Sequence, residues 1–308
     1  LQSGDLISFI SYIGQVLSAV MMVAMMMVML VMSRASMARI TEVLAEKPSI
    51  NDDDAKDIAV ADGSIEFDDV SFSYNGNPDN PNLEHINLKI ASGETIGIIG
   101  GTGSAKSTLV QLIPRLYDVT SGAVKVAGHN VKDYKIQTLR HSVSMVLQKN
   151  VLFSGTIKEN LKWGNADATD AEIEEACRAA AADGFIKGFP DGYDTELGQG
   201  GVNVSGGQKQ RLCIARALIS KPKIIILDDS TSAVDTATDA AIRKALSEEL
   251  SSTTTIIIAQ RIASVMDADR IVIMNEGKID DVGTHAELMQ RSEIYREVYY
   301  SQQKGVEE

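Results

Sequence analysis

The sequence predicts an α/β fold with a mainly parallel sheet, preceded by one transmembrane helix. From Ser64 onward, short apolar runs alternate with helical stretches such as Ser107–Leu116 and Thr236–Leu250, a pattern typical of strands joined by crossover helices. The segment from Thr169 to Ser220 is helical in pattern nearly throughout, so we expect a helical subdomain inserted into the α/β body. The apolar runs expected to form strands are Ile65–Phe72, Thr95–Ile99, Val143–Leu147, Lys223–Leu227, Thr255–Ala259 and Arg270–Met274.

The expected transmembrane helix lies near the start of the sequence. From Leu6 to Ser33 the chain carries no ionisable side chain apart from Tyr12, and this run exceeds the ~20 residues needed to cross a hydrocarbon core of ~30 Å. A buried core helix rarely stays apolar on every face for so long. A signal peptide fits poorly, because a basic n-region and a small-residue cleavage site are missing. We therefore interpret residues 1–33 as the last transmembrane helix of a longer membrane chain.

The charges that flank this helix predict its orientation. Only Asp5 precedes the apolar run, whereas Arg34, Arg39 and Lys47 follow it. Basic residues accumulate on the cytoplasmic side of membrane helices, so we expect the rest of the chain in the cytoplasm, attached to the cell membrane. Residues 34–62 are interpreted as a helical connection followed by a polar linker.

The overall charge argues against one class of partner. The 308 residues carry 42 acidic and 29 basic side chains, a formal net charge of −13. Nucleic-acid binding needs a basic surface that neutralises phosphates, so we expect no nucleic-acid partner. The two cysteines, Cys177 and Cys213, have no C-x-x-C spacing and are expected to be reduced rather than disulfide-bonded or zinc-bound.

A glycine-rich loop follows the apolar run that ends at Ile99. The phosphate-binding loop has the form G-x-x-x-x-G-K-[ST], and here Ala105 replaces its second glycine. Successive backbone N–H groups can surround phosphates at a helix N-terminus, while Lys106 would reach the β and γ phosphates and Ser107 would ligate Mg²⁺. No G-x-G-x-x-G frame fits, which excludes a dinucleotide-binding loop. The nucleotide-binding residues expected here are Gly100, Gly101, Thr102, Gly103, Ser104, Ala105, Lys106, Ser107 and Thr108.

A pair of carboxylates follows the apolar run Lys223–Leu227. Asp228 would stand at the carboxyl end of a buried strand, where ligands collect in open α/β sheets, and would hold Mg²⁺ through water. Asp229, one residue further on, stands where a carboxylate could activate a water molecule. Taken alone, the pair is also consistent with a solvated strand end.

The segment VSGGQKQRLCIARALI contains the most specific motif of the chain. Ser205, Gly206, Gly207 and Gln208 match the Leu-Ser-Gly-Gly-Gln signature of the ATP-binding-cassette (ABC) family, with Val204 in place of the leucine. The serine and the two glycine amides are expected at a helix N-terminus, which is a favourable place for an anion. The chain therefore resembles this family, and the segment LFSGTIKENL is similar to exporters in particular.

The resemblance covers about residues 64–300 and implies a fold, cofactors and a partner. It implies a phosphate-loop ATPase domain at residues 63–304 with an antiparallel β subdomain and a helical subdomain at about 150–220, binding ATP and Mg²⁺. In the family the signature closes over the γ-phosphate bound by the opposite subunit. A second exporter half, the lipid bilayer and a transported small molecule, lipid or peptide are therefore the expected partners.

Three further positions take roles from the resemblance. Tyr74 matches the aromatic residue that stacks on adenine, and Gln148 matches the glutamine that contacts Mg²⁺ and senses the membrane domain. Asp235, at the end of a Ser-Ala-Val-Asp segment, matches a dimer-contact residue. With Ser107 and Asp228, Gln148 completes the implied metal site.

The chain departs from the family pattern at several catalytic positions. Asp229 stands where the family has the hydrolytic glutamate, and its side chain is one methylene shorter, which could leave a water molecule badly held. Gln260 replaces the switch histidine and can donate a hydrogen bond but never carry a positive charge. With Ala105, three changes fall on one composite site, whereas the signature that serves the other site is intact; Gln199 also replaces a common glutamate.

This distribution favours the degenerate half of a heterodimeric, multidrug-type ABC exporter, whose own site turns ATP over slowly. Three alternatives stay open: a homodimeric exporter with two slow sites, a soluble regulatory ABC ATPase, and a half that senses nucleotide without transporting. The apolar run and the acidic composition argue against the soluble ATPase.

Overall fold

The computed structural model describes residues 3–229, 236–249 and 252–304, in two compact units, Leu1–Asn51 and Asp52–Glu308. The first unit contains α1 (Ser3–Ala45), a 43-residue helix with no buried residue. At 1.5 Å per residue it is about 65 Å long, roughly twice the thickness of a hydrocarbon core. Among the described residues, α1 alone is long and apolar enough to cross a membrane. It runs unbroken through residue 33, where the sequence analysis ends the membrane segment.

The larger sheet of the second unit is mainly parallel, as predicted. In spatial order its strands are β12 (Lys278–Gly283), β11 (Arg270–Asn275), β3 (Thr95–Gly100), β10 (Thr254–Ile258), β9 (Ile224–Asp228) and β6 (Val143–Val146). Every residue of β9 and β10 is buried, as expected for central strands covered on both faces. Ile258 pairs with Ile98 on one side and with Asp228 on the other, so the carboxyl ends of β3, β9 and β10 lie level.

A second, antiparallel sheet packs with helix α2 (Lys106–Gln111). Its strands, in spatial order, are β2 (Leu83–Ile90), β1 (Ile65–Phe72), β4 (Ser121–Val126) and β5 (His129–Asn130). Phe67 and Ile86 of this sheet, Leu109 of α2 and Ile98 of β3 belong to one buried apolar cluster. The antiparallel β subdomain is thus joined to the main sheet by a common core that contains the helix after the glycine-rich loop.

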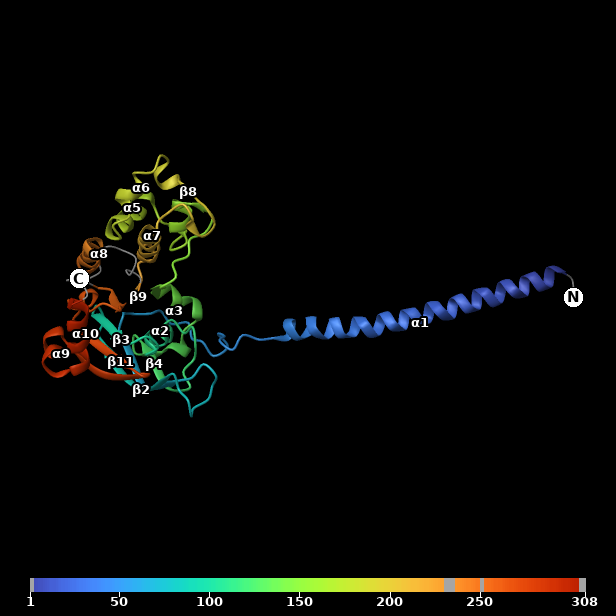
Figure 1. Ribbon diagram of the computed structural model, residues 1–308, viewed down its shortest axis with the longest axis horizontal. Coiled ribbons are helices and arrows are strands. Elements are labelled where there is room, and N and C mark those ends of the chain that lie inside the picture. Colours follow the sequence, from blue (N-terminus) through green and yellow to red (C-terminus); the bar gives the residue numbers. More distant parts are fainter. Residues whose placement is uncertain (1–2, 230–235, 250–251, 305–308) are drawn as a thin grey trace. The chain divides into compact units, whose positions relative to one another are not determined.

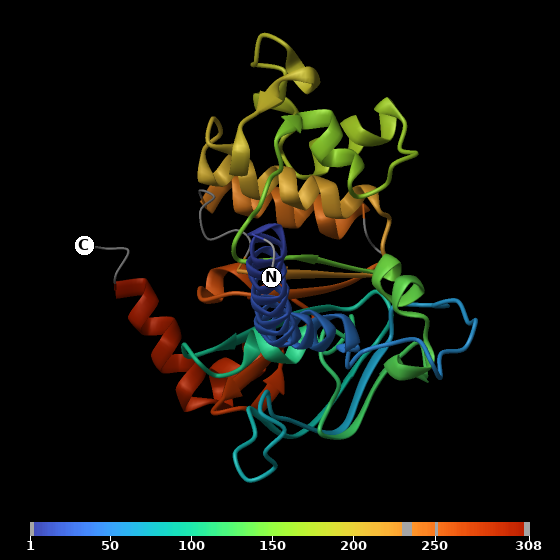
Figure 2. The same ribbon diagram turned by 90° about the vertical axis from the view of Figure 1, so that its right-hand side faces the viewer.

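The inserted segment contains four α-helices and a small two-stranded antiparallel sheet. These elements are β7 (Gly155–Thr156), α4 (Ile157–Lys162), α5 (Asp170–Ala179), α6 (Asp183–Ile186), β8 (Glu196–Leu197) and α7 (Gly206–Ile219). Thr156, Thr169 and Ser205 each begin a helix with a capping box, in which the side chains of the first and fourth residues bond to each other's backbone N–H. Figure 1 shows α5, α6 and α7 together at one end of this unit, away from α2 and β2, and Figure 2 shows the same division after a 90° turn.

The nearly continuous helical pattern expected between Thr169 and Ser220 is interrupted between α6 and α7. There the chain forms β8 and two 3₁₀ turns, η2 (Gly192–Asp194) and η3 (Gln199–Gly201). Gly192, Gly200 and Gly201 have φ values of 53°, 68° and 66°, which lie outside the right-handed helical region. The helical periodicity of the flanking segments does not indicate that this glycine-rich part between them is not α-helical.

The remaining described elements surround the main sheet. They are η1 (Val131–Asp133), α3 (Ile136–Ser142), α8 (Thr236–Glu249), η4 (Ile262–Ser264), α9 (His285–Arg291) and α10 (Glu293–Lys304). Helix α2 ends at Gln111 rather than at the expected Leu116, because Pro114 disfavours helical conformation in the residue before it. The domain boundaries expected at residues 33, 62, 150 and 220 stay predictions.

Candidate active site

The glycine-rich loop joins the buried strand β3 to α2. A side chain at Gly100 would place its Cβ 2.2 Å from the Met274 carbonyl oxygen, so only glycine fits between the two strands. Gly103 has a φ of 83°, and a Cβ there would meet no described atom within 4 Å. Ala105, the N-cap of α2, has a φ of 67° and offers no side-chain hydrogen bond to the helix. The loop therefore presents the N-terminus of α2 without a side-chain cap.

Lys106 lies at the centre of this loop. Its Nζ donates to the carbonyl oxygens of Gly100 and Gly101, both at 2.8 Å, and to Ser104 Oγ at 3.3 Å. Burial lowers the pKa of the Lys106 amine, and the charges of Asp228 and Asp229 oppose that shift. The ammonium group is thus held beside both carboxylates by contacts that a phosphate could replace.

Asp228 is the last residue of β9, and it is buried. Burial raises the pKa of its carboxyl group, while a hydrogen bond from the Ser107 side chain lowers it. A hydroxyl and a carboxylate are oxygen ligands of the kind that Mg²⁺ prefers, and Mg²⁺ commonly binds through one or two protein groups and completes its shell with phosphates and water. The residues present therefore fit a magnesium ion.

Asp229 connects two strand ends by hydrogen bonds. Its Oδ2 accepts from Gln148 Nε2 at 3.2 Å and from Gln260 Nε2 at 2.9 Å. Burial raises the pKa of the Asp229 carboxyl group, and these two hydrogen bonds oppose the shift. Gln148 follows β6, Asp229 follows β9 and Gln260 follows β10, so the common carboxyl edge of the sheet brings the three side chains together.

Tyr74 lies beside α2, as its expected role requires. Its hydroxyl is 3.1 Å from Thr108 Oγ1 and donates to Gln111 Oε1 at 3.4 Å. The ring is half exposed and makes edge contacts with Phe72 and Tyr117, with ring centroids 4.8 and 5.1 Å away. An aromatic face is therefore available next to the glycine-rich loop.

The signature residues are not part of this cluster. Ser205 Oγ accepts from the Gln208 N–H at 3.3 Å, and Gln208 Oε1 accepts from the Ser205 N–H at 2.9 Å. Ser205 and Gly206 are exposed at the N-terminus of α7, and Gly207 follows in its first turn. Figure 1 shows α7 well apart from α2, so the chain does not bring its own signature to its own glycine-rich loop. Asp235 lies outside the described residues.

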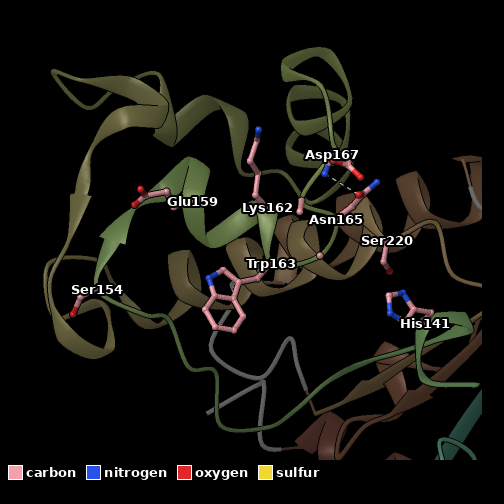
Figure 3. A pocket seen from close by; sticks show the side chains of 10 residues that line it. His141, Ser154, Glu159, Lys162, Trp163, Asn165, Asp167 and Ser220 are labelled. Carbon is pink, nitrogen blue, oxygen red and sulfur yellow. Dashed lines mark hydrogen bonds between the residues drawn. The ribbon is translucent and has the colours of Figure 1, made fainter. Parts of the chain in front are cut away.

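A groove lies beside Gln148, and the sequence did not predict it. The segment that follows Gln148 was noted only for its similarity to exporters. The rings of Phe153 and Trp163 stack there, with centroids 4.6 Å apart, and Trp163 is 68% exposed. Trp163 also lines an adjoining pocket, drawn in Figure 3, where it lies between Ser154 on one side and His141 on the other. An exposed tryptophan in a loop is the signal that could have pointed to this groove. Other residues that line it are Arg140, Leu147, Lys149, Val151, Cys213 and Arg216.

Comparisons with known proteins relate this chain to ABC transporters. Residues 83–232 match the family model of the ABC transporter. The chain is 46% identical over 245 residues to a multidrug export ATP-binding/permease protein of Staphylococcus aureus, covering 80% of this chain and 42% of the relative. It is 41% identical over 306 residues to the multidrug export ATP-binding/permease protein YgaD of Bacillus subtilis, covering 97% of this chain and 52% of YgaD. The chain thus spans about half the length of these relatives.

A solved structure extends the likeness to three dimensions. The structure of a bacterial Atm1-family ABC exporter with ATP bound superposes with a TM-score of 0.82 at 34% sequence identity, covering 86% of this chain and 46% of that chain. This match, with the family model, confirms the predicted ABC ATPase fold.

Proposed function

The chain contains an ABC transporter nucleotide-binding domain, which the family model matches over residues 83–232, and from this premise we propose that the chain is the ATP-binding and ATP-hydrolysing part of an ABC exporter. The observation that carries the proposal is the convergence of Lys106, Ser107 and Asp228 with Asp229 at the carboxyl edge of the main sheet. The exporter function comes from the relatives, whose names state multidrug export, and from the Atm1-family structure.

Nucleotide binding would use the glycine-rich loop and Tyr74. Lys106 Nζ can exchange the carbonyl oxygens of Gly100 and Gly101 for phosphate oxygens, since all are acceptors of the same ammonium group. Ser107, Asp228 and Gln148 would supply hydroxyl, carboxylate and amide oxygens for Mg²⁺, which would neutralise phosphate charge when bound. The exposed face of Tyr74 would stack on the adenine.

Hydrolysis at this site is proposed to be slow. Asp229 would have to hold and deprotonate water, but its side chain is one methylene shorter than that of a glutamate. Gln260 is neutral and cannot add a positive charge near a γ-phosphate. We therefore infer a degenerate site that binds ATP, in a chain whose intact Ser205–Gln208 signature serves the site of a second exporter half.

The membrane part of the proposal rests on α1. The match to YgaD covers 97% of this chain and therefore includes most of α1. Residues 1–33 would span the membrane, with residues 34–62 as the connection and residues 63–304 as the cytoplasmic nucleotide-binding domain. A single cysteine placed at Lys47 should react with a membrane-impermeant reagent only in inside-out vesicles; labelling from the outside of intact cells would contradict this orientation.

The alternatives differ in measurable ways. A soluble regulatory ATPase is disfavoured by α1 and by relatives named as permeases. A homodimeric exporter would show two equivalent slow sites, and a sensing half would bind nucleotide without transport.

The test uses the full-length protein, co-purified with any partner half and reconstituted into liposomes. We expect ATP binding, ATP hydrolysis and ATP-dependent movement of lipophilic dyes across the bilayer. Absence of ATP binding would refute the proposed function, and binding without any transport would favour the sensing half.

A further inference from the structure

We propose that Gln302, in the C-terminal helix α10, is a positioning residue for the ATP site. It holds the backbone around Gln260, and thereby directs the Gln260 side chain onto Asp229. The inference rests on the proposed function, because it assigns Gln302 a part in the hydrolysis at this site.

The side-chain amide of Gln302 binds the loop after β10 at two points. Gln302 Nε2 donates to the carbonyl oxygen of Gln260 at 2.7 Å, and the Ile262 N–H donates to Gln302 Oε1 at 2.9 Å. The amide thus bridges residues 260 and 262 as a neighbouring strand would. These contacts join positions 42 and 40 residues apart in sequence.

The bridged loop carries the group that contacts Asp229. Gln260 and Arg261 are exposed, and Ile262 begins η4, where the chain turns away from the sheet. The Gln260 side chain donates to Asp229 Oδ2 at 2.9 Å. Gln302 is therefore linked to the Asp229 carboxylate by two side-chain hydrogen bonds, with Gln260 between them. Hydrogen bonds are short, so a displacement of Gln260 by about 1 Å would break its hydrogen bond to Asp229.

Helix α10 is anchored well enough to hold Gln302 in place. Tyr295 is completely buried, and its hydroxyl lies 2.7 Å from His285 Nδ1. Val298 and Tyr299 pack against the buried apolar cluster to which Tyr295 belongs. Gln302 stands seven residues, or about two turns, after Tyr295, so both side chains lie on the same face of the helix.

The geometry requires an amide of this length. A glutamate could accept from the Ile262 N–H but would face the Gln260 carbonyl oxygen with a second acceptor. An asparagine would be one methylene too short to span both groups. Gln303 is a matched control, because it is exposed in the same helix and its Nε2 donates to the Tyr299 hydroxyl at 2.8 Å.

The kinetic test compares Gln302→Ala with Gln303→Ala in the full-length protein, reconstituted with its partner half or as a homodimer. Single-turnover hydrolysis at this site is measured, with the partner's own base replaced where a partner exists. We expect Gln302→Ala to slow hydrolysis about 3–10-fold with the KM for ATP unchanged within about twofold, since misplacement rather than lost binding is the cause. Gln303→Ala should change neither quantity, and equal effects of the two changes would overturn the proposal.

A double change distinguishes positioning from a general structural effect. If Gln302 acts through Gln260, Gln302→Ala should cause no further loss in a Gln260→Ala background, because the group it directs is absent. The same additional loss in that background would overturn the proposal. Gln302→Glu should not restore the rate; full activity in that variant would also contradict the role of the Gln302 amide.

Hydrogen exchange tests the contact without hydrolysis. The Ile262 amide should exchange about fivefold faster in Gln302→Ala than in Gln303→Ala, as expected for one lost hydrogen bond. Unchanged exchange would overturn the proposed contact even in an active protein. If the protein without substitutions does not bind ATP, the proposed function is refuted. If it binds ATP but does not hydrolyse it, the role proposed for Gln302 is refuted.

Discussion

The N-termini of α2 and α7 are both proposed to face phosphates, but the hydrogen bonds that cap them differ. At the N-terminus of α7, the backbone N–H groups of Ser205 and Gln208 are each bonded by the other residue's side chain. The N-cap of α2 is Ala105, which provides no side-chain hydrogen bond. Unpaired N–H groups at a helix N-terminus favour an anion. The α2 end is therefore prepared for a phosphate within its own subunit, whereas at the α7 end the Ser205 hydroxyl can donate to a partner's phosphate while its oxygen keeps the capping bond.

The largest effect is expected from damage at the α7 end. Ser205→Arg places a bulky cation where the serine and two glycines would meet the partner's γ-phosphate, so steady-state ATPase of the reconstituted pair should fall by about 10²-fold or more, as for loss of an essential transition-state contact. Thr284→Ala is the control, because it removes a similar capping box from α9. That change should cost about 1 kcal/mol of stability and leave ATPase unchanged. Equal losses for Ser205→Arg and Asp229→Asn would favour two equivalent sites.

A smaller effect is expected from Lys106→Ala at the α2 end. The ammonium group that bonds to Gly100 and Gly101 would be lost, and with it charge-assisted bonds to phosphate. We expect ATP affinity at this site to weaken about 10–100-fold, with a loss of pair ATPase between those of Ser205→Arg and Asp229→Asn. Equilibrium binding of labelled ATP measures the effect. Unchanged affinity would show that the nucleotide does not lie on this loop.

A double change at Asp229 and Gln260 is expected to raise the rate of ATP hydrolysis rather than lower it. The double change Asp229→Glu with Gln260→His restores the reach of a base and a group that can be charged, so single-turnover hydrolysis at this site should rise by about an order of magnitude. Asp229→Asn should lower pair ATPase only slightly, because the aspartate is already too short. If the double change has no effect, Ala105 or the partner's signature limits the rate.

The smallest effect concerns the N-cap of α2 itself. Ala105 has a φ of 67°, a conformation that costs a residue with a Cβ about 1 kcal/mol, so Ala105→Gly should raise the unfolding midpoint by about 2–4 °C. ATP affinity should change less than about threefold. Ala127→Gly, at a φ of 48° outside the site, should give a similar thermal shift without affecting ATP. A lower midpoint in Ala105→Gly would show that the packing of its methyl group outweighs the strain.

Local patterns in the sequence determined five strands of the main sheet (all except β12), the phosphate loop, the signature and the apolar helix. Each of these is encoded within a few consecutive residues: strand runs by burial on both faces, the loop by its glycines and lysine, and α1 by an unbroken apolar composition. The signature cap was equally local, since Ser205 and Gln208 are three residues apart.

Only the tertiary structure decided what lies between α6 and α7, and which side chains meet Asp229. Glycines with positive φ interrupt the helical pattern after Ile186, and periodicity does not record such turns. Gln148, Asp229 and Gln260 follow β6, β9 and β10, which are neighbours in the sheet although the inserted helices separate β6 from β9 in the chain. Gln302 reaches the same site only because buried Tyr295 fixes the position of α10. Contacts between residues tens of positions apart depend on strand order and helix packing, and no short segment of sequence contains that information.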